Sequence, residues 1–284
     1  TAPNSFIASA GAIGVLGAIP VFVDICTDLN LDPAQLEKAI TPKTKAIMPV
    51  HLTGRPAKMK QIIEIAEYHK ISVVEDAAQA IGARLAGKRV GGIGDAACFS
   101  LHPLKNFHAF GDGGVVTTNS QDILDNMIMA RNHGLRNREK CDFWSYNSRL
   151  DEIQAAMLSV QLPLLDKWTE ERREIAFRYN ELLRPYVDVP DEGEGEYCVF
   201  QTYVVQAPQR DELKTYLNEN GVQALVHYSI PLHLQPAAKY LDYQKNDFPV
   251  TMEMSNKIMS LPLYPELSKQ QQDYVASLFK KFYK

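Results

Sequence analysis

A short segment of mostly β-branched residues, 71–74, ends in two acids, Glu75 and Asp76, and follows an amphipathic stretch at 57–69. An apolar segment at 46–50 precedes that stretch, so the pattern predicts a strand, a helix and a second strand. Such units connect by right-handed crossovers and build a largely parallel sheet with helices on both faces. Ligands bind at the carboxyl ends of such strands, so Asp76 is expected at a binding edge.

A lysine on a nearby loop suggests what binds there. Lys105 lies between two predicted strands, 96–100 and 115–118, and a glycine-rich turn follows it. Lysine amines form Schiff bases with carbonyl groups, and pyridoxal phosphate (PLP) needs such an amine and an acid facing its ring nitrogen. Asp76 would supply that acid, Ser100 could bind the phosphate, and Gln79 could reach the ring hydroxyl. Ordinary alternatives remain, because loop lysines are usually solvated and an Asp after a strand is often a helix cap.

Composition narrows the class of protein. The 284 residues are 45% hydrophobic, enough for one large or two modest domains. A net charge of -4 offers no electrostatic case for nucleic acid or an anionic membrane as a partner. The apolar run 11–23 is broken by Pro20 and too short to span a bilayer, and no basic segment precedes it as in a signal peptide. Four cysteines without metal-ligand spacing favour free thiols in a reducing cytoplasm, and no metal site is predicted.

Six sequence blocks occur in an order that resembles the DegT/DnrJ/EryC1/StrS family of PLP-dependent nucleotide-sugar aminotransferases. They are VVEDAAQAIGA, GDAACFSLHPLKN, GDGGVVTTN, RNHG, YNSRLDEIQAAML and VHYSIPLHLQPA. The resemblance covers essentially the whole chain. It implies the type I aspartate aminotransferase fold, an α/β architecture with a three-layer large domain around a mostly parallel sheet. The large PLP-binding domain would span 1–165, and a linking helix and smaller α+β domain would span 166–284. Because family members carry an upstream stretch with a phosphate-binding turn, we expect the N-terminal part of the large domain to be missing.

The same resemblance implies roles for individual residues. Lys105 would carry PLP covalently, Asp76 and Gln79 would hold its ring, and Ser100 its phosphate. Phe6 would stack on PLP, although a core phenylalanine is an equal alternative. Asn147 would reach across a homodimer interface to the partner's cofactor phosphate, whereas the residues that follow it read by themselves as a helix start capped by Ser148.

The sequence leaves the roles of three histidines open. His233 lies in a loop expected over the mouth of the active site, where it would touch substrate or only fix the loop. His108 stands where the family usually has small residues, and whether it faces substrate is undecided. His51 ends the strand 46–50, and a capping or loop role is favoured over a catalytic one.

By resemblance the amino donor is L-glutamate and the acceptor a nucleotide-linked keto-hexose used for surface polysaccharide, such as lipopolysaccharide O-antigen, or for a glycosylated metabolite. The Lys105-Asn106 pair and the turn at 111–113 favour a 3-keto over a 4-keto sugar. Three alternatives stay open: a PLP-dependent sugar dehydratase, a cyclitol aminotransferase and a PLP-binding regulator without turnover. The lysine argues against the first, because the well-known dehydratase of this family has histidine there.

The remaining patterns predict further elements of both domains. Asp32-Pro33 begins a helix, Ser120 caps another, and Pro163 interrupts a long one. Strands are predicted at 18–25, 199–206 and 222–228, and helices at 120–133, 164–183, 211–220 and 268–283.

Overall fold

The computed structural model describes residues 1–284 and contains a central sheet of four strands. Their order is β1 (Ala46–Ile47), β2 (Ser72–Asp76), β5 (Ala96–Ser100) and β6 (Gly114–Thr118). The first three are parallel, and β6 is antiparallel to β5. The expected α/β fold is confirmed, with a mixed rather than uniformly parallel sheet. The reversal at β6 follows from its connection, because residues 101–113 form a loop without the helix that a parallel crossover needs.

Helices α1 (Ile7–Val15), α2 (Pro33–Ala39) and α3 (Met59–His69) belong to the same half of the chain, with a short 3-10 turn η1 (Leu52–Gly54) between the last two. Asp32 caps α2 as predicted, because its carboxylate accepts from the Ala34 N–H at 3.0 Å. The strand predicted at 18–25 is wrong. That segment is extended, but its N–H and C=O groups at Val23 and Val21 bond to Thr1 instead of a sheet strand.

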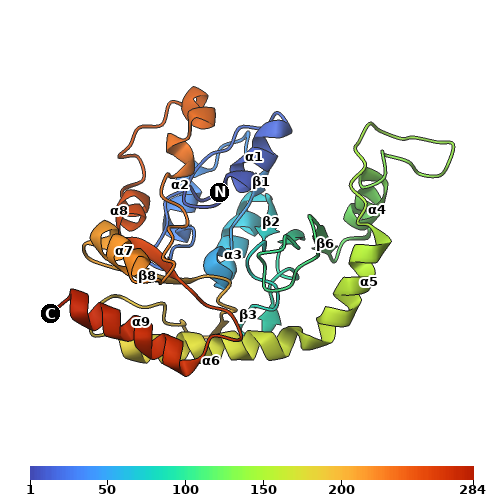
Figure 1. The fold of residues 1–284 in the computed structure, drawn as a ribbon. Coiled ribbons are helices and arrows are strands. Elements are labelled where there is room, and N and C mark those ends of the chain that lie inside the picture. The colour runs from blue at the N-terminus through green and yellow to red at the C-terminus, as the bar shows by residue number, and fades with distance from the viewer.

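A long helical stretch links the two halves of the chain (Figure 1). It follows α4 (Gln121–Ala130) and comprises α5 (Glu152–Gln161), the 3-10 turn η2 (Leu162–Leu164) and α6 (Leu165–Leu183). Pro163 interrupts it as predicted. The predicted cap at Ser148 is wrong: Asp151 occupies the N-cap position, because Asn147 pairs with Asn132 in a β-bridge and delays the helix start. In Figure 1, α4, α5 and their connecting loop extend away from the central sheet.

The C-terminal half packs helices against a two-stranded sheet of β8 (Tyr203–Gln206) and β9 (Ile258–Leu261). The helices are α7 (Arg210–Glu219), α8 (Pro249–Lys257) and α9 (Lys269–Phe282), with 3-10 turns η3 (Leu232–Leu234) and η4 (Pro236–Leu241). The strand predicted at 222–228 is wrong, since only Leu225 bridges to β9. A third small sheet joins β3 (Arg84–Leu85), β4 (Lys88–Arg89) and β7 (Glu196–Tyr197).

Two large apolar cores stabilise these halves. One lies among α6, α7, α9, β8 and β9 and includes the fully buried Tyr179, Tyr203 and Phe279. The other surrounds α3, β1 and β2, yet it also contains Val204 and Ile258 from β8 and β9. The C-terminal strands therefore contribute to the core beneath the central sheet. None of the helices combines the length and the apolar character needed to cross a membrane.

The end of β2 is held by a buried carboxylate. Glu75 has no exposed surface and accepts hydrogen bonds from the N–H groups of Gly91, Ile93 and Gly94 at 2.7 to 2.9 Å. It also accepts from His51 Nε2 at 3.0 Å. His51 Nδ1 accepts from the Ala57 N–H, so the ring proton sits on Nε2 and His51 has a structural role. Burial alone raises the pKa of Glu75, but these donors outweigh it and lower that pKa to about 2.

We expect Glu75→Gln to lower the free energy of unfolding by about 2 kcal/mol or more, because either amide orientation places an NH2 group against two donors. Urea unfolding monitored by circular dichroism at pH 7 measures the loss. Glu67→Gln, on the exposed face of α3, is the matched control and should change stability by less than about 0.5 kcal/mol. Equal stability of the two variants would contradict this role of Glu75.

The lowered pKa of Glu75 also predicts how the stability of the protein depends on pH. Since folding lowers the pKa of Glu75 from near 4.5 to about 2, its contribution is complete above pH 4.5 and is lost as the pH falls toward 2. The stability difference between wild type and Glu75→Gln should therefore shrink across that range.

Candidate active site

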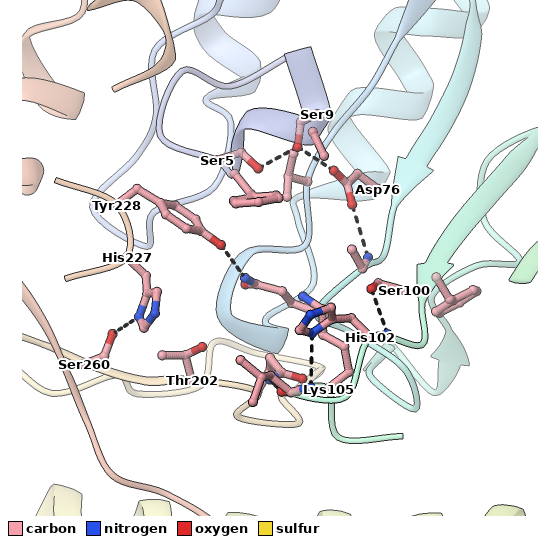
Figure 2. A pocket seen from close by; sticks show the side chains of 18 of the residues that line it. Ser5, Ser9, Asp76, Ser100, His102, Lys105, Thr202, His227, Tyr228 and Ser260 are labelled. Carbon is pink, nitrogen blue, oxygen red and sulfur yellow. Dashed lines mark hydrogen bonds between the residues drawn. The ribbon is translucent and has the colours of Figure 1, made fainter. Parts of the chain in front are cut away.

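A cavity of about 880 Å³ opens at the carboxyl ends of β2 and β5. Its walls come from α1, the Lys105 loop, residues 201–203, the segment around Tyr228 and the end of β9. Figure 2 shows Asp76 with Ser5 and Ser9 on one side of the cavity, His227 and Tyr228 on another, and Lys105, Ser100 and Thr202 around the rest. The cavity therefore lies at the edge of the sheet where the sequence predicted a ligand.

Asp76 is oriented by two donors. Ser9, in α1, donates from Oγ to Asp76 Oδ2 at 2.7 Å, and the Ala78 N–H donates to Oδ1 at 3.2 Å. Ser5 Oγ lies 2.7 Å from Ser9 Oγ. Because the Ser9 proton points to the carboxylate, Ser5 donates to Ser9. The two serines were not predicted, although their spacing of four residues near the start of a helix could have indicated a shared face.

Gln79 and two aromatic rings form the wall next to Asp76. Gln79 Oε1 accepts from the Thr53 N–H at 2.6 Å, and its Nε2 donates to the Tyr228 hydroxyl at 3.4 Å. The Tyr228 ring lies 5.6 Å from the Phe6 ring, which is half exposed and lines the cavity. Burial raises the pKa of Tyr228, so its hydroxyl is neutral and retains a proton to donate. Tyr228 was missed because the contact spans 149 residues.

Lys105 lies on the loop between β5 and β6, as expected, and is half-buried. Burial lowers the pKa of its amine, whereas the negative charge of Asp76 opposes that shift. Ser100, at the end of β5, lines the same cavity, and its Oγ accepts from the His102 N–H at 3.3 Å, which leaves the hydroxyl proton available. The structure therefore brings together the predicted site residues Asp76, Gln79, Ser100, Lys105 and Phe6.

Three other predicted residues do not line this cavity. His233 is 3% exposed and packs its ring against Phe248 at 4.8 Å, which favours the alternative that it fixes the loop. The His108 ring lies 3.1 Å from the main-chain carbonyl oxygen of Lys105 and holds the loop from outside the cavity. Asn147 is exposed on the segment before α5.

The donor set of the cavity fits a cofactor with a cationic ring nitrogen, a phosphate and a carbonyl carbon. Asp76 offers a fixed anion, Ser100 an unassigned hydroxyl proton, and Lys105 an amine whose pKa burial lowers. Phe6 supplies a half-exposed aromatic face. No group of three or more His, Cys, Asp or Glu side chains is arranged to hold a metal ion.

Comparison with known proteins supports the same cofactor chemistry, and the similarity extends along the whole chain. A model of the DegT/DnrJ/EryC1/StrS aminotransferase family matches residues 1–280. The chain is 46% identical to the "Pleiotropic regulatory protein" of Geobacillus stearothermophilus, over 100% of this chain and 78% of the relative. It is 41% identical to dTDP-3-amino-3,6-dideoxy-alpha-D-galactopyranose transaminase of Aneurinibacillus thermoaerophilus, over 98% of this chain and 77% of the relative.

Solved structures agree in fold. The crystal structure of S. venezuelae DesV in complex with a ketimine intermediate superposes with a TM-score of 0.95 at 37% identity, covering 100% of this chain and 80% of DesV. The PLP form of Spr1654 from Streptococcus pneumoniae superposes with a TM-score of 0.92 at 26% identity, covering 98% of this chain and 79% of Spr1654.

The lowered pKa of Lys105 predicts that its amine reacts at lower pH than an exposed lysine. In cofactor-free protein, acylation followed as a function of pH by peptide mass spectrometry should show Lys105 modified at lower pH than Lys60, an exposed internal reference. Asp76→Asn should move the Lys105 curve lower still, because it removes the charge that opposes the shift. A curve for Lys105 that coincides with that of Lys60 would show that burial does not act on this amine.

Proposed function

Because the chain belongs to the DegT/DnrJ/EryC1/StrS aminotransferase family, we propose that it transfers the amino group of L-glutamate to the C3 keto carbon of a nucleotide-linked keto-hexose. The chain is a PLP-dependent transaminase, and PLP is its cofactor. One observation carries the residue assignment: the half-buried Lys105 amine, with its lowered pKa, lines the same cavity as the oriented Asp76 carboxylate.

In this proposal each side chain has a separate task. Lys105 would hold the cofactor covalently, Asp76 would keep its ring nitrogen protonated by accepting a hydrogen bond from it, and Ser100 would donate to its phosphate. Gln79 binds the ring hydroxyl, and Phe6 packs on the ring face. When bound, PLP supplies an electron sink that stabilises negative charge on the α-carbon of the amino donor.

Lys105 also moves the proton. An amine that is released from the cofactor must be neutral to remove a proton from the donor's α-carbon. Burial lowers the pKa of Lys105 and so raises the fraction of neutral amine near pH 7. The Asp76 charge limits this effect, which keeps the amine able to return the proton in the second half of the reaction.

Neutral polar side chains in the cavity are suited to bind the hydroxyl groups of a sugar. His227 lines the cavity, and its pKa is lowered by burial and by the charge of Lys105. Its Nδ1 lies 2.8 Å from Ser260 Oγ, which leaves Nε2 for a ligand. Tyr228 and Tyr264 line the same cavity and carry hydroxyl groups. The 3-amino sugar in the name of the Aneurinibacillus relative supports the 3-keto preference. The product would serve surface polysaccharide or glycosylated metabolite synthesis in the cytoplasm, where the four free cysteines would stay reduced.

A homodimer completes the proposed site. Asn147 is exposed and lies outside the cavity of its own subunit. Large apolar side chains on the segment before α5 and on α5 itself are also exposed, Trp144 by 95%, Val160 by 75% and Ile153 by 73%. Such a surface suits contact with a second copy, which would place Asn147 at the partner's cofactor phosphate.

A regulatory role is the second candidate, because the Geobacillus relative is named as a regulatory protein. The presence of Lys105, Asp76, Gln79 and Ser100 in one cavity favours turnover, since a scaffold has no use for the acid that keeps the ring nitrogen protonated. A sugar dehydratase or a cyclitol aminotransferase would share this set, and trials with the corresponding substrates separate them.

The first test of the proposed function follows the absorbance of the PLP-loaded protein. L-glutamate alone should abolish the yellow band of lysine-bound PLP and produce the aminated cofactor, and a 3-keto nucleotide sugar should restore the band. A band that persists under glutamate would contradict the proposed donor, and aminotransfer only to 4-keto sugars would contradict the position. Lys105→Ala should lack the band and turnover while unfolding at the same urea concentration as wild type.

Subunit complementation tests the shared site. Lys105→Ala and Asn147→Ala should each be nearly inactive alone, but their mixed dimers contain one site with both residues intact. Random reassociation should therefore restore about a quarter of the wild-type activity. Absence of any recovery, with mixed dimers verified by mass, would contradict the contribution of Asn147 across the interface.

A further inference from the structure

Gln201 holds both peptide groups that flank Lys105. Its side-chain Nε2 donates to the Leu104 carbonyl at 2.8 Å, and its Oε1 accepts from the Asn106 N–H at 2.9 Å. Gln201 belongs to the C-terminal half, between β7 and β8, about 95 residues from the loop that it contacts. One side-chain amide therefore forms hydrogen bonds with the peptide group before Lys105 and with the peptide group after it.

Gln201 is itself held in place by the segment to which it belongs. Phe200, directly before Gln201, is buried in the left-handed region at φ 44°, a conformation that bulky side chains rarely adopt. Asn106 Nδ2 donates to the Val199 carbonyl at 2.9 Å, so the loop is tied to this segment by a third hydrogen bond. The Val199 N–H donates to the Gly54 carbonyl at 3.0 Å. Residues 199–201 therefore have a fixed position relative to both the Lys105 loop and the turn at Gly54.

The turn at Gly54 allows this close approach. A Cβ atom at Gly54 would lie 2.8 Å from Val199 Cγ2 and 3.0 Å from both the Gln201 nitrogen and the Gln79 carbonyl oxygen. Its φ of 92° also favours glycine. Beside it, the Thr53 N–H donates to Gln79 Oε1. The same small region therefore sets the positions of Gln79 and of Lys105 on two walls of the cavity.

We propose that Gln201 is a positioning residue that fixes the direction and the burial of the Lys105 amine. Its consequence for catalysis rests on the proposed function, but its effect on Lys105 does not. Without the amide, the loop around Lys105 would open toward solvent, the amine would be less buried, and the lowering of its pKa would diminish. The reaction would slow because a small misplacement of a reacting group is costly.

The test compares Gln201→Met, which keeps the length of the side chain and removes both hydrogen bonds, with Gln206→Met as a matched control. Gln206 lies on β8 outside the cavity and donates one hydrogen bond to the Thr27 carbonyl. In cofactor-free Gln201→Met, the acylation curve of Lys105 should move to higher pH, toward that of Lys60. Hydrogen exchange at the Asn106 amide should be about tenfold faster, as expected for the loss of a hydrogen bond. Gln206→Met should change neither quantity.

With PLP and substrates, kcat of Gln201→Met should fall by about tenfold to a hundredfold while KM for the sugar stays the same. A role in binding sugar would instead raise KM, and a role in stability alone would leave the Lys105 curve in place. Either result overturns the proposal. Should Gln201→Met fail to fold, Gln201→Asn decides, because its shorter side chain reaches at most one of the two peptide groups and should give a smaller shift in the same direction. An unshifted curve for Lys105 in that variant would equally overturn it.

The two proposals fail separately. If the wild type shows no conversion under glutamate, the aminotransfer proposal is wrong, yet acylation and hydrogen exchange still decide the role of Gln201.

Discussion

The buried carboxylate of Glu75 is the interaction on which the geometry of the site depends. Neighbouring side chains of a strand point to opposite faces, so the residue that anchors β2 in the protein interior directs the next one, Asp76, to the other side. Four donors hold Glu75, and three of them are main-chain N–H groups between Gly91 and Gly94. These bonds tie the connection before β5 to the end of β2. The start of β5 is therefore fixed beside β2, and the cavity opens beyond the carboxyl ends of both strands. Asp76 needs only Ser9 and Ala78 to complete its orientation.

Lys105 is subject to two opposing effects. Burial favours the neutral amine, and the charge of Asp76 favours the ammonium. Because the effects oppose each other, the protonation state of the lysine depends on small changes in burial and in local charge. A loop that moved freely would expose the amine and remove the first effect. The bond that Gln201 donates to the Leu104 carbonyl and the bond that it accepts from the Asn106 N–H therefore hold the loop at the point that keeps the amine buried.

The residues that the sequence could identify are those whose role follows from local position. Asp76 and Ser100 end strands, Gln79 follows one, and Lys105 lies on the loop between two, so the periodicity of a short stretch was enough to bring them together. Ser9, Gln201 and Tyr228 contact that set across 67, 95 and 149 residues, and no local pattern indicates such contacts. The wrong strand at 18–25 has the same cause: these residues have strand propensity, but Val21 and Val23 form hydrogen bonds with Thr1 instead of with a sheet strand.

The two halves of the chain contribute different chemistry to the cavity. The N-terminal half supplies the ionisable pair, Asp76 and Lys105, on elements that the central sheet positions. The C-terminal half supplies neutral polar groups, among them His227 and Tyr228. A further charge in this half-buried space would shift the pKa of Lys105, whereas phenols and a neutral imidazole can bind hydroxyl groups without doing so. In the proposed reaction the sugar would therefore be recognised mainly by the C-terminal half, while the protonation of the lysine depends on Asp76 in the N-terminal half and on Gln201, which keeps the lysine loop in place.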